Sequence, residues 1–268
     1  MRLASLPMYD LPEVRWAHDA LWDAIAARLR DAGVADVPAE LTRDCALSDH
    51  WASPDLLLSQ TCGYPLVTRF AGRLTVIATP VYRAPGCEGP TYRSAFVVAE
   101  SSAARDLSDL RGAVCAVNER TSHSGMNALR AAIAPLAGGA PFFREVRLTG
   151  AHVASVASVQ VGEADVCAID AVTHALLARH RPAALEGTRV LGLSTSAPAL
   201  PYVTRARASA GEIASIRDAL AAAIGAPELS AAREALLLER FEPSNEAGYA
   251  RIAEIEAEAI ALGYADLA

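Results

Sequence analysis

Short apolar runs alternate with segments of helical periodicity along most of the chain. Apolar runs that end in polar residues cover residues 55–60, 74–80, 112–118 and 164–169. Between the last two, Met126, Leu129 and Ile133 recur at helical spacing. This alternation predicts an α/β fold, with mostly parallel sheets flanked by helices. Because the 268 residues exceed the ~150 of a common domain, we expect two lobes.

All 24 basic residues are arginine, because the chain contains no lysine. Schiff-base catalysis, pyridoxal phosphate attachment and the phosphate-binding lysine of a P-loop are therefore excluded. The 31 acidic residues bring the formal net charge to −7. Without a chain-wide basic field we expect no nucleic-acid partner, and without an apolar run of about 18 residues we expect no membrane insertion.

The chemistry-bearing residues form none of the usual sequence patterns of an enzyme or a metal site. The five cysteines are spaced 17, 25, 28 and 52 residues apart, which leaves no paired zinc ligands. Ser122 and His123 are too close in sequence for a catalytic triad, which draws its members from separate segments. We therefore assign no catalytic residue, no metal ligand and no cofactor.

The segment Thr121-Ser122-His123-Ser124-Gly125 is the main candidate for a ligand site. It places three hydroxyls and an imidazole on a polar loop between an expected strand and an expected helix. Unpaired N–H groups at a helix N-terminus attract an anion, and Gly125 would let the anion approach the backbone. An ordinary N-cap by Ser122 or Ser124 is the alternative.

His152 and Asp170 lie at two other strand ends that the α/β pattern predicts. His152 would begin a helix after Gly150, and a proton on its ring would add positive charge facing an anion. Asp170 could accept a hydrogen bond from a ligand or could cap the following helix.

Ligands of α/β sheets bind outside the carboxyl ends of strands, and three residues nearer the N-terminus meet that condition. Tyr9 and Tyr64 each end or follow a short strand, where a phenol can donate to a ligand or simply pack against the core. Gln60 ends the run 55–60. We include all three among the expected ligand contacts.

The motifs also resemble a known family when they are read in chain order. They are Tyr64, Pro80-Val-Tyr82, Thr91-Tyr-Arg-Ser94, Leu107-Ser-Asp-Leu-Arg-Gly112, Ser122-His-Ser-Gly125, Thr149-Gly-Ala-His152 and Gly162-Glu-Ala-Asp-Val-Cys-Ala-Ile-Asp170. Over residues 1–205 they are similar to the PhnD-like phosphate, phosphite and phosphonate substrate-binding proteins of ABC transporters. That family often has Ser-Thr-Ser-Gly where this chain has Ser-His-Ser-Gly.

The resemblance implies a type 2 periplasmic-binding-protein fold with a ligand cleft between its lobes. Lobe one would comprise residues 1–92 and 185–268, and lobe two residues 93–184. The function implied is binding of a small oxyanion such as phosphate, phosphite or phosphonate, with an ABC permease as partner if the protein is exported. The family's ligand contacts would correspond to Tyr64, Ser122, His123, Ser124, His152 and Asp170.

Two classes of function remain open. One is an oxyanion-binding protein without enzymatic activity, which we favour. The other is a cytosolic enzyme on the same bilobed fold that acts on a small organic acid or a pyrimidine-like metabolite.

The first ten residues bear on the location of the protein. They contain one arginine, and Pro7 and Asp10 interrupt their apolar stretch, which is not typical of a signal peptide. The sequence as it stands therefore predicts a cytoplasmic location. A periplasmic location is the alternative if a leader was removed.

Overall fold

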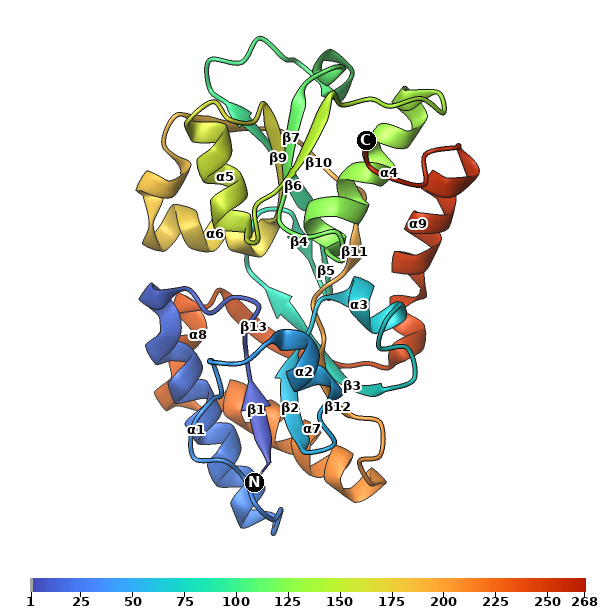
Figure 1. Ribbon diagram of the computed structural model, residues 1–268. Coiled ribbons are helices and arrows are strands. Elements are labelled where there is room, and N and C mark those ends of the chain that lie inside the picture. The colour runs from blue at the N-terminus through green and yellow to red at the C-terminus, as the bar shows by residue number, and fades with distance from the viewer. Residues whose placement is uncertain (1) are drawn as a thin grey trace. The chain divides into compact units, whose positions relative to one another are not determined.

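The computed structural model describes residues 2–268, which divide into two units. Unit 1 comprises residues 1–83, 88–90 and 198–249, and unit 2 comprises residues 84–87, 91–197 and 250–268. Each unit has a five-stranded sheet with helices packed against it, as Figure 1 shows. The expected α/β fold in two parts is therefore confirmed.

The sheet of unit 1 has the strand order β1-β2-β12-β3-β13. Its strands are β1 (Leu3–Ser5), β2 (Leu56–Gln60), β12 (Tyr202–Arg205), β3 (Leu74–Tyr82) and β13 (Leu238–Pro243). β1 pairs with β2 in parallel, and β12 pairs antiparallel with β2 and β3. Every residue of β2 is buried, which places the polar end of this strand inside the protein.

The helices of unit 1 include α1 (Arg15–Asp31), which packs against α7 (Ala210–Gly225) and α8 (Ser230–Ala235). Leu21, Ile25 and Leu29 are spaced four residues apart and are all buried, so one face of α1 joins the core. The shorter helices are η1 (Pro12–Val14), α2 (Leu47–Ala52), α3 (Gly63–Val67), η5 (Pro227–Leu229) and η6 (Glu246–Tyr249).

The sheet of unit 2 has the strand order β10-β6-β9-β7-β8. Its strands are β10 (Thr188–Leu193), β6 (Ser94–Ala99), β9 (Val166–Asp170), β7 (Val114–Val117) and β8 (Glu145–Leu148). β7 pairs in parallel with β8 and β9, so the carboxyl ends of these three strands lie at the same edge. In this unit the candidate ligand residues follow β7 (Thr121 to Ser124), follow β8 (His152) or end β9 (Asp170).

The helices of unit 2 include α4 (Ala128–Ala137) and the C-terminal α9 (Ala250–Ala261), which lie side by side (Figure 1). A π-helical turn, η3 (His123–Asn127), leads directly into α4. The others are η2 (Leu107–Leu110), α5 (His152–Gln160), α6 (Ala171–His180) and η4 (Pro182–Leu185). A third, small sheet has the order β11-β5-β4, with strands Ala197–Pro198, Thr91–Tyr92 and Cys87–Glu88.

The structure corrects two expectations about the fold. The sheets are mixed rather than mostly parallel, because strands joined by a crossover helix run in parallel and the remaining pairs run antiparallel. The units also differ from the expected lobes, since residues 185–197 and 250–268 belong to unit 2. Residues 185–197 contain β10, which pairs with β6, and residues 250–268 contain α9, which packs on α4. Residues 238–243 form β13 along β3.

Asp10 stabilises the start of unit 1 through an ion pair rather than by capping a helix. Its carboxylate accepts hydrogen bonds from Arg43 Nε at 2.7 Å and Nη2 at 3.3 Å. His18 Nδ1 lies 3.3 Å from the same group. Burial alone would raise the pKa of Asp10, but the hydrogen bonds from His18 and Arg43 outweigh it and lower the pKa to about 2.

We expect Asp10→Asn to lower the free energy of unfolding at pH 7 by about 1–2 kcal/mol, a value reduced for solvent screening of a partly exposed pair. The lowered pKa means that this contribution is present above the ordinary pKa of 3.8 and is lost as the pH falls towards 2. Urea denaturation at several pH values tests this. Equal stability of the two proteins at pH 7 would contradict the prediction.

Candidate ligand-binding site

The serine-rich segment forms the buried start of a helix in unit 2. Ser122 is the N-cap, and its Oγ accepts a hydrogen bond from the Gly125 N–H at 3.0 Å. The five residues of η3 are all buried, and they continue into α4. Because π-helical turns are frequent at functional sites, this geometry favours ligand binding over simple capping. The capping role is nevertheless real, since Ser122 performs it.

Ser124 and His152 bring two helix starts together. Ser124 Oγ lies 2.8 Å from His152 Nε2 and 3.5 Å from Ser122 Oγ. Ser124 belongs to η3, whereas His152 is the first residue of α5. The structure thus unites Ser122, Ser124 and His152, three of the residues expected from the sequence. We call these three residues the Ser–His cluster.

His152 contributes a neutral ring rather than the positive charge expected from the sequence. Burial lowers its pKa to about 4, and a backbone interaction with Ala168 acts weakly in the opposite direction. The residue keeps some exposed surface, but its Nδ1 is enclosed and has no regularly aligned hydrogen-bond partner among residues 2–268. At neutral pH the Ser–His cluster therefore offers hydrogen bonds and dipoles.

Gly125 is required at its position for a reason that the sequence did not indicate. A Cβ on this residue would lie 1.9 Å from Asn118 Oδ1 and 3.3 Å from His152 Cε1. Asn118 follows β7, and its Oδ1 is buried without a hydrogen-bond partner in the described part of the chain. Asn118 ends the apolar run 112–118 and so lies at an expected strand end, but it was not among the expected ligand contacts.

His123 is buried and has well-defined neighbours. Its Nδ1 lies 3.1 Å from Asn127 Nδ2, and its ring makes an edge-to-face contact with Tyr92, with ring centroids 6.1 Å apart. Burial, together with the charge of Arg130, lowers the pKa of His123 to about 4. Asn127 and Arg130 gave no signal in the sequence, because they are spaced like ordinary residues of a helix.

The structure does not bring Thr121 or Asp170 into the Ser–His cluster. Thr121 is exposed, and its hydroxyl donates to Glu119 at 3.4 Å. Asp170 caps α6, since its Oδ1 accepts from the N–H groups of Val172 and Thr173 at 2.7 and 3.2 Å. For Asp170 the capping alternative is therefore confirmed.

Two of the three residues expected in unit 1, Tyr9 and Gln60, are buried and contact Tyr82. Gln60 Nε2 donates to Tyr82 Oη at 3.2 Å and to the Leu200 carbonyl at 3.1 Å. Tyr9 packs edge to face on Tyr82, with ring centroids 5.2 Å apart. Tyr64 is half-buried in α3. Tyr82, which joins Tyr9 to Gln60, was not among the residues expected from the sequence.

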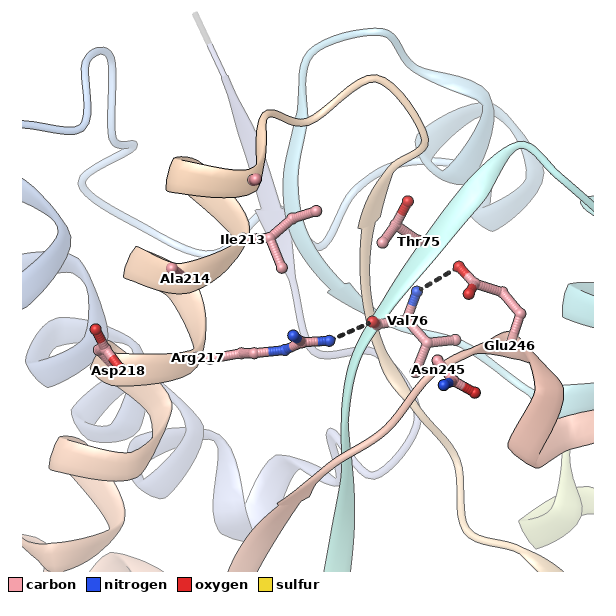
Figure 2. A pocket seen from close by; sticks show the side chains of 9 residues that line it. Thr75, Val76, Ile213, Ala214, Arg217, Asp218, Asn245 and Glu246 are labelled. Atoms are coloured by element: carbon pink, nitrogen blue, oxygen red, sulfur yellow. Dashed lines mark hydrogen bonds between the residues drawn. The ribbon is translucent and has the colours of Figure 1, made fainter.

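A cavity of about 440 Å³ also opens in unit 1, between α7 and β3 (Figure 2). Arg217 reaches across it, and its guanidinium donates to the carbonyls of Ile77 and Ser244 at 3.0 and 3.1 Å. Glu246 accepts from the Val76 N–H at 3.0 Å. Both charged side chains thus bind backbone groups, which belong to β3 and to Ser244 after β13. We therefore assign this cavity no ligand.

We expect the free energy of unfolding to decrease as the pH falls from 6.5 to 4. The pKa of His123 and His152 is lowered in the folded protein, so protons bind to the unfolded state first in this range. The loss should be on the order of 2–3 kcal/mol for His123 and smaller for His152, which keeps exposed surface.

Denaturation of His123→Gln and His152→Gln between pH 4 and 7.5 measures these contributions. Each variant should show a shallower pH dependence than the wild type. Asp10→Asn serves as the control, because its effect belongs to a lower pH range. An unchanged slope in His123→Gln would contradict the prediction.

Comparison with solved structures identifies proteins of similar fold. Three solved structures share the fold over 96–97% of this chain at 15–16% identity. A binding protein of a phosphonate ABC transporter from Pseudomonas aeruginosa has a TM-score of 0.77, with 87% of that chain covered. PhnD1 from Prochlorococcus marinus, in complex with methylphosphonate, has a TM-score of 0.74 with 97% covered, and a Xanthomonas citri protein bound to chloride has 0.73 with 98% covered.

No curated protein sequence matches the chain significantly. The helices of residues 2–268 include none that is long and apolar enough to cross a membrane. A family model for the periplasmic substrate-binding proteins of phosphonate ABC transporters matches residues 53–249. Because this match covers most of the chain, the protein belongs to that family of substrate-binding proteins.

Proposed function

We propose that the ligand is a small phosphorus oxyanion, namely a phosphonate, phosphite or phosphate, and that the Ser–His cluster binds it. The observation that carries this proposal is the 2.8 Å contact between Ser124 and His152 at the starts of two helices. N–H groups at a helix start and the helix dipole favour an anion with several oxygens. The methylphosphonate bound to PhnD1 supports the same class of ligand.

The Ser124 hydroxyl has a single proton, and this decides which group donates each hydrogen bond. To donate to an anion, Ser124 must accept its other hydrogen bond, and His152 Nε2 is placed to supply it. Nδ1 of His152 carries no proton in this arrangement. His152 thus donates to Ser124, and Ser124 donates to the ligand.

We also retain the expected contacts of unit 1, Tyr9, Gln60 and Tyr64, as proposals. The support is strongest for Gln60. The Leu200 carbonyl can only accept, so it fixes Nε2 of Gln60 as the donor and leaves Oε1 as an acceptor. This oxygen is buried and has no hydrogen-bond partner within residues 2–268. A donor on the ligand would satisfy it.

The contact between Ser124 and His152 also has the length that a nucleophile and its base require. A triad would add a carboxylate on Nδ1 of the histidine, and in the described structure Nδ1 has no such hydrogen bond. This favours binding without turnover, as does membership of a family of binding proteins. Recovery of unchanged ligand, measured by ³¹P NMR after long incubation, would support this, whereas a new phosphorus species would favour the enzyme.

The permease partner and the location depend on export. The family acts with ABC transporters in the periplasm, which supports a permease partner for an exported form. The cytoplasmic location expected from residues 1–10 remains the alternative proposal. Leu3–Ser5 form β1 and pair with β2, so cleavage after residue 10 would remove a strand of the sheet.

Ser124→Ala and His152→Gln should each weaken the binding of methylphosphonate by about 10- to 100-fold, as expected for the loss of a hydrogen bond to a charged group. Isothermal titration calorimetry with methylphosphonate, phosphite and phosphate measures the effect. Ser215→Ala is the matched control, because that hydroxyl donates to a backbone carbonyl within α7 of unit 1. Affinities within twofold of the wild type for both site variants would contradict the proposal.

Fractionation of cells that express the gene from its native locus tests the location. Recovery in the cytoplasmic fraction would support the cytoplasmic location. Recovery in the periplasm with a processed N-terminus upstream of β1 would establish the alternative and would support a permease partner.

A further inference from the structure

Asn127 is a fully buried side chain whose three hydrogen bonds connect η3, α4 and α9. Its Nδ2 donates to His123 Nδ1 at 3.1 Å and to the Ile252 carbonyl of α9 at 3.3 Å. Its Oδ1 accepts from Arg130 Nη2 at 2.6 Å. All three partners belong to unit 2, as Asn127 does.

The partners of Asn127 determine which way its amide is oriented. A carbonyl oxygen can only accept a hydrogen bond, and a guanidinium can only donate one. Nδ2 must therefore face Ile252, and Oδ1 must face Arg130. Turning the amide over would place N–H against the guanidinium and oxygen against the carbonyl, so both hydrogen bonds would be lost.

Arg130 is held as firmly as Asn127. Only 4% of its surface is exposed, and its Nη1 donates to the Ala265 carbonyl at 2.6 Å. Its Nη2 also contacts Glu256 Oε1 of α9 at 3.0 Å. The C-terminal segment 250–268 thus supports Asn127 both directly, through Ile252, and indirectly, through Arg130.

This orientation determines the protonation of His123. Because Nδ2 of Asn127 donates, Nδ1 of His123 must accept and carries no proton. The proton of the neutral ring is then on Nε2. We propose that Asn127, held by α9 and Arg130, fixes His123 as the neutral Nε2–H tautomer and so gives the serine-rich segment an imidazole N–H donor.

The charges around His123 are consistent with a neutral ring. The nearest is the Arg130 guanidinium from α4, which disfavours a second positive charge, and Glu256 of α9 is paired with that guanidinium. From the small sheet, Tyr92 contributes an aromatic contact. At the end of β9, Asp170 is engaged by the start of α6.

The inference rests on the proposed function for its ligand but not for its tautomer. In the family motif, a threonine hydroxyl often stands where this chain has His123. A neutral imidazole with Nε2–H offers a hydrogen-bond donor without adding a charge. Asn127 is therefore a positioning residue, and His123 is the group that it prepares.

Long-range ¹H–¹⁵N NMR of the ligand-free protein, labelled at histidine, tests the tautomer at pH 7. The signals of His123 are assigned by their absence in His123→Gln. We expect the shift of an unprotonated nitrogen at Nδ1 and of a protonated nitrogen at Nε2. A protonated Nδ1 in the wild type would overturn the inference, whether or not any ligand binds.

Asn127→Asp tests whether Asn127 sets the tautomer of His123. A carboxylate has no N–H to donate, so Nδ1 of His123 should become protonated in this variant. Asn245→Asp, an exposed position of unit 1, is the control and should leave the His123 signals unchanged. An unprotonated Nδ1 in a folded Asn127→Asp protein would show that Asn127 does not set the tautomer. If this variant does not fold, the wild-type spectrum decides.

Two substitutions of His123 separate donation from packing, with methylphosphonate as the probe. His123→Phe keeps an aromatic ring against Tyr92 but has no donor, whereas His123→Gln keeps an N–H group. We expect binding at least tenfold weaker for the Phe variant and within about threefold of the wild type for the Gln variant. Equal affinities for the two variants would overturn the donor role.

If the wild type binds none of methylphosphonate, phosphite or phosphate, the proposed function fails. The NMR result then still decides the tautomer and the role of Asn127. The two conclusions can therefore fail separately.

Discussion

Buried polar groups must find hydrogen-bond partners, and Asn127 is where unit 2 meets this requirement for its candidate ligand-binding segment. Its amide joins His123 on η3 to Arg130 on α4 and to the backbone of α9. Because the Ile252 carbonyl can only accept and the Arg130 guanidinium can only donate, the network allows a single orientation of the Asn127 amide. The start of the helix is thereby held rigid before any ligand arrives, which reduces the ordering that binding requires.

The same burial makes the candidate site neutral. Both histidines have a pKa lowered to about 4, so at pH 7 neither ring carries a charge. A phosphorus oxyanion would therefore be bound by hydroxyls, imidazole N–H groups and backbone amides. Such donors discriminate by geometry and by the number of acceptors on the ligand, whereas a buried cation would attract any anion.

Much of the site could be predicted from the sequence, because its motif is local. Ser122 and Ser124 follow an apolar run, so their place at a strand end and a helix start could be inferred. Their contact with His152 joins segments 28 residues apart, and only the pairing of β7 with β8 and β9 creates it. Asn127 and Tyr82 were missed because their roles depend on Ile252 of α9 and on Gln60 of β2, which lie far away along the chain.

The sequence by itself determined the α/β class, the strands that carry the ligand residues and the exclusion of lysine chemistry, since these follow from local periodicity and composition. Tertiary structure decided the rest. The antiparallel strands β12 and β13, the membership of α9 in unit 2 and the lowered histidine pKa values all depend on contacts between residues far apart in the chain. Local patterns contain no information about which distant segment will bury a given residue, and burial decides both the hydrogen-bond partners and the charge of these side chains.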